Sequence, residues 1–151
     1  MNDAISYDNV LVPTDGSEAA EASLAHAMTI ARDHGCSIHA LYVIDQRMTM
    51  AAEADTRERL LESMEREGQQ ALETIADRLE RAGLKSESAM REGTPAKEIL
   101  AYAADVGIDL IVIANSGKSP REKRLAMGSV SERVVEESSL PVLVIKAPDV
   151  S

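Results

Sequence analysis

The residues whose types and spacing point most directly to chemistry lie between positions 114 and 133. Gly128 and Ser129 come just before a stretch with helical character. The free N–H groups and the dipole at a helix start attract anions, and a glycine lets a phosphate approach the backbone. The same segment carries a cluster of basic residues in a chain whose formal net charge is −10. This basic cluster consists of Lys118, Arg121, Lys123 and Arg124, with Glu122 as the one acid among them.

These residues also have explanations that need no ligand. Ser129 and Glu132 have the spacing of a capping box, which satisfies the first N–H groups of a helix. Exposed lysines and arginines usually stay solvated. Asp15 presents the same choice, because it suits a ribose or adenine donor but also forms an Asp15-x-x-Glu18 helix cap. On the residues alone, anion binding and simple capping both stay open.

Other kinds of active site lack a supporting pattern. His26 and His34 are eight residues apart and His39 falls in an apolar run, so the three histidines do not have zinc-ligand spacing. The Walker and Rossmann glycine patterns and the nucleophile elbow are absent. Cys36, the single cysteine, opens an apolar run and is expected to be a small buried hydrophobe.

Composition excludes several partners. The chain has no Trp, no Phe and three Tyr, which disfavours stacking on single-stranded nucleic acid, and its negative charge repels a polyanion. No apolar run approaches membrane-spanning length, and the first nine residues are polar. We therefore expect a cytoplasmic protein with no nucleic-acid or membrane partner. The eleven arginines against five lysines suit a high-salt cytoplasm or ordinary acidic solubility equally well.

The elements that must position these residues alternate along one domain, 1–151. Helices are expected from the start signal at 15–18 to about Arg32, over 57–81, from Thr94 and Pro95 to Gly107, and over about 130–137. Residues 46–56 form a connection without an assigned structure. Buried strands are expected at 10–12, 38–44, 109–113 and 141–145, with a weaker polar strand nearer an edge at 84–91.

This alternation predicts an α/β fold with a five-stranded parallel sheet sandwiched by four helices. Such sheets bind ligands at the carboxyl ends of strands, near the point where the strand order reverses. The positions to inspect are therefore 13–17, 43–46, 91–93 and those from Ala114 onward.

The chain resembles the universal stress protein family over nearly its whole length. The resemblance rests on the order and spacing of six pieces: Val10-Leu-Val-Pro-Thr-Asp-Gly-Ser-Glu18, Leu41-Tyr-Val-Ile-Asp45, Gly93-Thr-Pro95, Asp109-Leu-Ile-Val-Ile113, Gly128-Ser-Val-Ser-Glu-Arg-Val-Val135 and Pro141-Val-Leu-Val-Ile145. It implies a Rossmann-like fold of the adenine-nucleotide alpha-hydrolase type.

The resemblance also implies an ATP site. In ATP-binding members a Gly-x-x-Gly, nine residues and a Gly-Ser or Gly-Thr cradle the ribose and phosphates. Here Ala114 stands at the first glycine, and ten residues separate Gly117 from Gly128. If position 114 needed a positive φ, alanine there would cost about 1–2 kcal/mol. The candidate nucleotide-binding residues are Pro13, Thr14, Asp15, Val43, Ala114, Gly117, Lys118, Gly128, Ser129 and Val130.

These features together lead to a functional hypothesis. The chain is expected to bind ATP, with Mg²⁺, and to act as a dimeric regulatory switch, with at most slow hydrolysis or self-phosphorylation. The resemblance implies pairing of two copies through the last strand, at Val142, Leu143, Val144 and Ile145, which is expected at a sheet edge. Ala114 and the longer loop favour the alternative, a dimeric interaction or chaperone-like module without a nucleotide.

Overall fold

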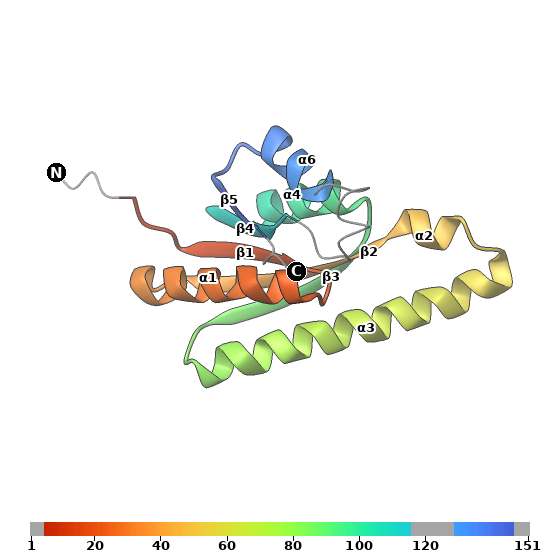
Figure 1. Ribbon diagram of the computed structural model, residues 1–151, viewed down its shortest axis with the longest axis horizontal. Coiled ribbons are helices and arrows are strands. Elements are labelled where there is room, and N and C mark those ends of the chain that lie inside the picture. The colour runs from red at the N-terminus through yellow and green to blue at the C-terminus, as the bar shows by residue number, and fades with distance from the viewer. Residues whose placement is uncertain (1–4, 116–128, 147–151) are drawn as a thin grey trace.

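A computed structural model of the chain describes residues 5–115 and 129–146 (Figure 1). Its sheet has five strands in the order β3-β2-β1-β4-β5, and every neighbouring pair is parallel. The fold class predicted from the sequence is therefore confirmed. The strands are β1 (Asn9–Thr14), β2 (Ser37–Asp45), β3 (Ser86–Gly93), β4 (Leu110–Ala114) and β5 (Val142–Ile145).

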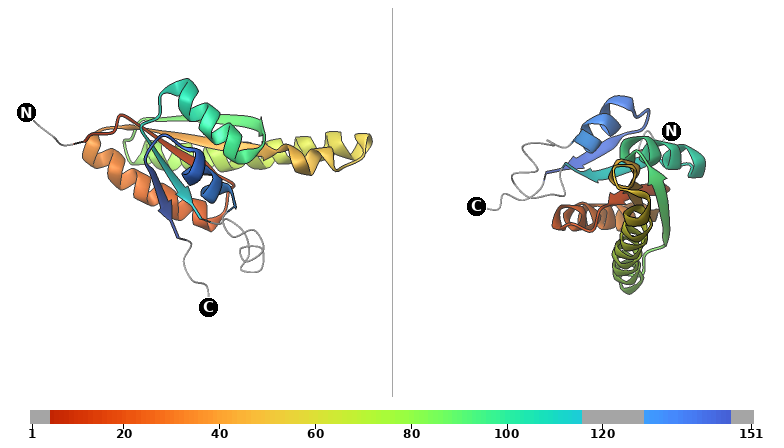
Figure 2. Two further views of the ribbon diagram at one scale, coloured as in Figure 1. Left: turned by 90° about the horizontal axis from the view of Figure 1, so that it is seen from above. Right: turned by 90° about the vertical axis from the view of Figure 1, so that its right-hand side faces the viewer.

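Helices cover both faces of this sheet (Figures 1 and 2). α1 (Glu18–His34) and α3 (Ala54–Arg81) lie on one face, and α4 (Pro95–Val106) and α6 (Ser129–Glu137) lie on the other. Because side chains alternate along a strand, β1 contributes to both layers. Val10 and Val12 pack against α1 and α3, whereas Leu11 belongs to the core under α4 and α6.

Local chemistry explains where α1 begins and ends. The Ser17 hydroxyl caps the helix by accepting a hydrogen bond from the N–H of Ala20 at 3.2 Å. Asp15 therefore does not cap α1, since its carboxylate accepts from the N–H of Ser17 at 3.0 Å instead. Gly35 ends the helix in the left-handed conformation with φ of 68°, as its position in the sequence predicted.

The connection at 46–56 is more ordered than the sequence indicated. It contains a short helix, α2 (Gln46–Met50), and the start of α3, which begins three residues earlier than the predicted Arg57. The Arg57 guanidinium donates hydrogen bonds to the carbonyls of Thr49 at 3.0 Å and Ala52 at 3.1 Å. The arginine thus ties the first turn of α3 to the end of α2, and both extend past the strand ends in Figure 1.

The two edge strands are only partly buried. The polar strand β3 lies at one edge, as predicted, and β5 lies at the other. The expectation that 141–145 is buried was wrong, because Leu143 and Val144 are 38% and 37% exposed. This exposure follows from the edge position, since β5 pairs with β4 alone within the described residues.

Gly68 is buried in the middle of α3, where glycine normally weakens a helix. A Cβ atom there would lie 2.6 Å from the Tyr42 ring and 2.7 Å from the end of Met90. The glycine therefore lets the helix backbone rest directly on the Tyr42 ring of β2.

We expect Gly68→Ala to destabilise the protein by about 1–3 kcal/mol, although alanine is the better helix former. The physical reason is the clash of the added Cβ atom with the ring of Tyr42, a residue that is only 8% exposed. Urea unfolding measures the effect, and Gln69→Ala on the exposed side of α3 serves as the control. A Gly68→Ala protein as stable as its parent would contradict the close packing.

Candidate functional site

The strand order reverses between β1 and β4. From β1 the chain runs outward through β2 and β3, and then returns to place β4 on the other side of β1. Val10 and Leu11 of β1 pair in parallel with Leu110 and Ile111 of β4. The carboxyl ends of both strands therefore lie side by side, at a place named the β1–β4 edge. This edge is where open parallel sheets bind ligands.

The turn after β1 is shaped by its own side chains. Pro13 and Thr14 are buried, and the Thr14 hydroxyl accepts from the N–H of Gly16 at 3.0 Å. Gly16 has φ of 81°, which favours glycine. Asp15 is exposed at this edge, with one carboxylate oxygen bound to the N–H of Ser17. The turn thus presents a carboxylate at the switch point in a fixed orientation.

Two further candidate residues lie on the neighbouring strands. Val43 is half-buried in β2 and pairs with Arg91 of β3. Ala114 is the last residue of β4 and pairs with Ile145 of β5. Because position 114 is part of a strand, its backbone is extended and alanine fits without strain, so the penalty that a positive φ would bring does not arise in this conformation.

The last helix starts at the predicted place. α6 begins at Ser129, which is exposed, and Val130 packs against the core beneath α4 and α6. Glu132 lies in its first turn. The other candidate residues, Gly117, Lys118 and Gly128, lie outside the described residues, as does the basic cluster.

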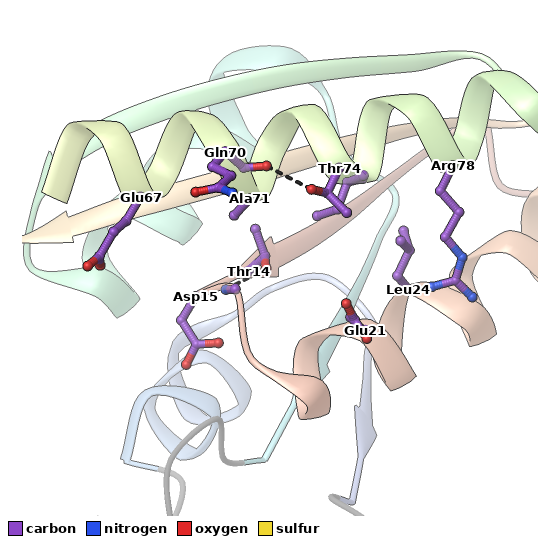
Figure 3. A pocket seen from close by; sticks show the side chains of 11 residues that line it. Thr14, Asp15, Glu21, Leu24, Glu67, Gln70, Ala71, Thr74 and Arg78 are labelled. Carbon is purple, nitrogen blue, oxygen red and sulfur yellow. Dashed lines mark hydrogen bonds between the residues drawn. The ribbon is translucent and has the colours of Figure 1, made fainter. Parts of the chain in front are cut away.

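A cavity of about 330 Å³ adjoins the β1 turn (Figure 3). It runs from Thr14 and Asp15 along the groove between α1 and α3 (the α1–α3 groove). Of the predicted site residues that the structure describes, Thr14 and Asp15 line it, and Pro13, Val43, Ala114, Ser129 and Val130 do not. Its remaining lining residues are Gly16, Glu21, Leu24, Glu67, Gln70, Ala71, Thr74, Ile75 and Arg78.

The α1–α3 groove is polar at both ends. Figure 3 shows Glu67 and Asp15 toward one end and Glu21 and Arg78 toward the other. Burial raises the pKa of the Tyr42 hydroxyl, and the charges of Glu67 and Asp15 raise it further. Tyr42 therefore stays neutral beneath the two carboxylates, and the end of the groove nearest β1 carries negative charge.

The end of β2 carries an ion pair. The Arg47 guanidinium donates to the Asp45 carboxylate at 2.6 Å, and the backbone N–H of Arg47 donates to it at 3.0 Å. These hydrogen bonds, led by those of the Arg47 side chain, lower the pKa of Asp45 below its ordinary value of 3.8. Asp45 thereby caps the N-terminus of α2.

Sequence reasoning missed the α1–α3 groove and the Asp45–Arg47 pair. A signal for the groove was present, since Glu67, Gln70, Thr74 and Arg78 repeat at helical spacing beside the apolar face of α3. Within residues 5–115 and 129–146, no group of three His, Cys, Asp or Glu lies close enough to hold a metal ion. No helix in the same ranges is long and apolar enough to cross a membrane.

The fold and the switch-point edge define a class of protein, the α/β proteins with a five-stranded parallel sheet. Residues 6–146 match the universal stress protein family, and the chain belongs to that family. It is 37% identical over 143 residues to universal stress protein MJ0531 of Methanocaldococcus jannaschii, covering 94% of this chain and 84% of that protein. The solved structure of MJ0577 from the same organism superposes with a TM-score of 0.87 at 32% identity, covering 97% and 100%.

Two more distant structures share the fold. A universal stress protein solved in complex with cAMP has a TM-score of 0.67 at 24% identity, covering 94% of this chain and 98% of that one. An Arabidopsis thaliana family member solved with AMP bound has a TM-score of 0.70 at 20% identity, covering 93% and 92%. Nucleotides thus occur in solved proteins that have this fold.

The Asp45–Arg47 pair gives a pH-dependent contribution to stability. Since the pKa of Asp45 is lowered by folding, its contribution is complete above the unfolded pKa and is lost as pH falls through the folded pKa. We expect Asp45→Asn to lose stability at neutral pH but little near pH ~2. The effect is small because the Arg47 side chain is 68% exposed. Thermal unfolding across this pH range measures it, with Asp33→Asn on the exposed side of α1 as control. Equal losses at both pH values would contradict the assignment.

Proposed function

We propose that this chain is an adenine-nucleotide-binding regulatory protein that holds ATP with Mg²⁺ at the β1–β4 switch point. The observation that carries the proposal is the arrangement of that edge. The Asp15 carboxylate follows β1, and α6 starts at Ser129 after the chain leaves the neighbouring strand β4. An acceptor for a nucleoside and a helix start for its phosphates belong to neighbouring strand connections.

Each candidate residue has a role at this site. The adenine would contact Pro13, Thr14 and the backbone of Val43. The Asp15 carboxylate oxygen that does not bind Ser17 would accept a hydrogen bond from adenine or ribose. The backbone N–H groups of Ser129 and Val130 donate hydrogen bonds to phosphate oxygens. Gly117 and Gly128 let the phosphates approach the backbone. Mg²⁺ would supply positive charge that offsets the negative charge of the phosphates. The relatives solved with cAMP and AMP support the nucleotide class.

The proposal includes a place for the basic cluster. Lys118, Arg121, Lys123 and Arg124 fall in the connection between β4 and α6, and could bind phosphate through charge-assisted hydrogen bonds. We assign the protein to the cytoplasm, where ATP and Mg²⁺ are available.

We expect micromolar ATP affinity that weakens as salt rises, because exposed charges are screened.

Gly128→Val should weaken binding about tenfold or more by placing bulk where backbone must meet phosphate. Asp15→Asn should cost about tenfold through the lost charged acceptor, while still accepting from the N–H of Ser17. Calorimetry with magnesium at moderate salt measures all three proteins.

Asp33→Asn is the matched control for Asp15→Asn, since Asp33 is exposed on α1 away from this edge. Its ATP affinity should equal that of the parent. If nucleotide-free parent protein gives no heat and no thermal shift with millimolar ATP, the interaction-module alternative becomes the better account.

We further propose that two copies pair through β5. Leu143 and Val144 expose apolar side chains on a strand whose outer edge has no partner among the described residues. Unpaired N–H and C=O groups on such an edge favour pairing with another strand. Val135 on α6 is also 50% exposed and adds apolar surface on an element packed against β5.

The dimer proposal predicts that Val144→Lys raises the monomer fraction in sedimentation velocity. A charge at the paired edge must be desolvated or repelled by its copy, and the expected shift toward monomer is about tenfold. Val106→Lys, at a residue 39% exposed at the end of α4, is the control and should remain dimeric. Parent protein that sediments as a monomer at micromolar concentration would contradict the proposal.

A further inference from the structure

His39 is a buried histidine on β2 that no part of the proposed nucleotide site uses. It is 4% exposed, and each of its ring nitrogens has a polar neighbour from another element. Nε2 lies 3.2 Å from the Asn9 side-chain oxygen on β1, and Nδ1 lies 2.9 Å from the Tyr102 hydroxyl on α4. The ring therefore joins the centre of the sheet to the helix that covers it.

The neighbours determine which nitrogen of the neutral ring carries the proton. The Asn9 amide nitrogen donates to the carbonyl of Gly107 at 3.5 Å, so the Asn9 oxygen is the atom that faces His39. That oxygen can only accept, so Nε2 carries the hydrogen. Nδ1 is then a bare acceptor, and the Tyr102 hydroxyl donates to it.

A second group lies within reach of the same nitrogen. The Glu87 carboxylate on β3 is 3.4 Å from Nδ1, and its side chain is 69% exposed. While the ring is neutral, Glu87 and Nδ1 are both acceptors and form no hydrogen bond. Protonation changes Nδ1 into a donor, and a charged carboxylate accepts a stronger hydrogen bond than a tyrosine hydroxyl does.

We propose that His39 is a proton-operated switch that controls how tightly α4 is attached to the sheet. When the ring is neutral, it accepts from Tyr102 and holds α4. When Nδ1 is protonated, the ring donates to Glu87, and the Tyr102 hydroxyl loses its acceptor. One proton thus moves the His39 contact from a helix to the exposed edge strand β3.

Other charged groups lie near Tyr102 and Asn9, the two side chains that contact the His39 ring. Arg91 of β3 lies over the Tyr102 ring at 5.1 Å and pairs with Asp105 at 2.9 Å and Glu98 at 4.0 Å, both on α4. On the β1 side, the Asp109 carboxylate accepts from the N–H of Asn9 at 2.9 Å. Burial, and after it the charge of Glu87, raise the pKa of Tyr102 by more than Arg91 lowers it, so Tyr102 keeps the proton that it donates.

The switch also has a route to the last helix. Tyr102 belongs to the same core cluster as Val134, which is fully buried on α6, and α4 packs against α6. Loosening α4 therefore affects the support of α6. Any consequence for phosphate binding rests on the proposed function, but the switch itself does not.

Hydrogen exchange tests the switch on the full chain without nucleotide. The α4 amides at 99–103 are compared at about pH 7.5 and about pH 5.5, the range in which histidines commonly titrate, after correction for intrinsic exchange. Protection in the parent should fall roughly fivefold at the lower pH, the equivalent of about 1 kcal/mol for one hydrogen bond. Nitrogen NMR of the neutral ring should show the hydrogen on Nε2.

Two variants separate the switch from a merely structural histidine. His39→Gln keeps one acceptor and one donor but cannot take up a proton, so its α4 protection should not depend on pH. Glu87→Gln removes the charged acceptor, and its Tyr102 contact should persist at the lower pH. The controls, His26→Gln on the exposed side of α1 and Glu92→Gln on the exposed side of β3, should respond as the parent does.

Three results would overturn the proposal. They are a neutral ring with the hydrogen on Nδ1, an equal pH response in the parent and His39→Gln, or no response in the parent. If His39→Gln fails to fold, Tyr102→Phe takes its place. Lacking the hydroxyl, it should show weak α4 protection at both pH values, and a parent-like pH response in Tyr102→Phe would equally exclude the switch.

Discussion

The rest of the structure depends on the parallel pairing of β1 with β2 on one side and β4 on the other. Val10, Leu11 and Val12 are fully buried, so this strand is packed on both faces and bonded on both edges. A strand in that position cannot shift by one residue without moving each of its side chains to the opposite face. The pairing therefore fixes where Thr14 and Asp15 leave the sheet.

The site follows from this constraint. Because β1 lies where the strand order reverses, the helices that come next along the described chain after β1 and β4, α1 and α6, lie on opposite faces of the sheet. Open parallel sheets bind ligands at the carboxyl ends of the strands at such a point. The β1 turn, held by Thr14, Asp15 and Ser17, is built from local hydrogen bonds and does not need a ligand to keep its shape.

Much of the fold could be predicted because the signals for strands and helix ends are local. Continuous apolar runs predicted the central strands. Gly35 and Gly107 end α1 and α4 in the left-handed conformation, as helix-stop signals predict.

The features that could not be predicted depend on contacts between residues distant in the sequence. Gly68 looks unfavourable in a helix until the Tyr42 ring of β2 is placed against it. His39 resembles any core histidine until Asn9, Glu87 and Tyr102 meet around it. The α1–α3 groove likewise exists only once two helices lie side by side.

Backbone NMR during an ATP titration tests most directly whether a nucleotide binds at the β1–β4 edge. Binding there should cause the largest shift changes at the amides of Thr14, Gly16, Val43 and Val130, which belong to three separate parts of the chain. The amides of β3 and of the middle of α3 should change little. Changes confined to the groove residues of α3, such as Gln70 and Thr74, or no change at millimolar ATP with magnesium, would contradict nucleotide binding at this edge.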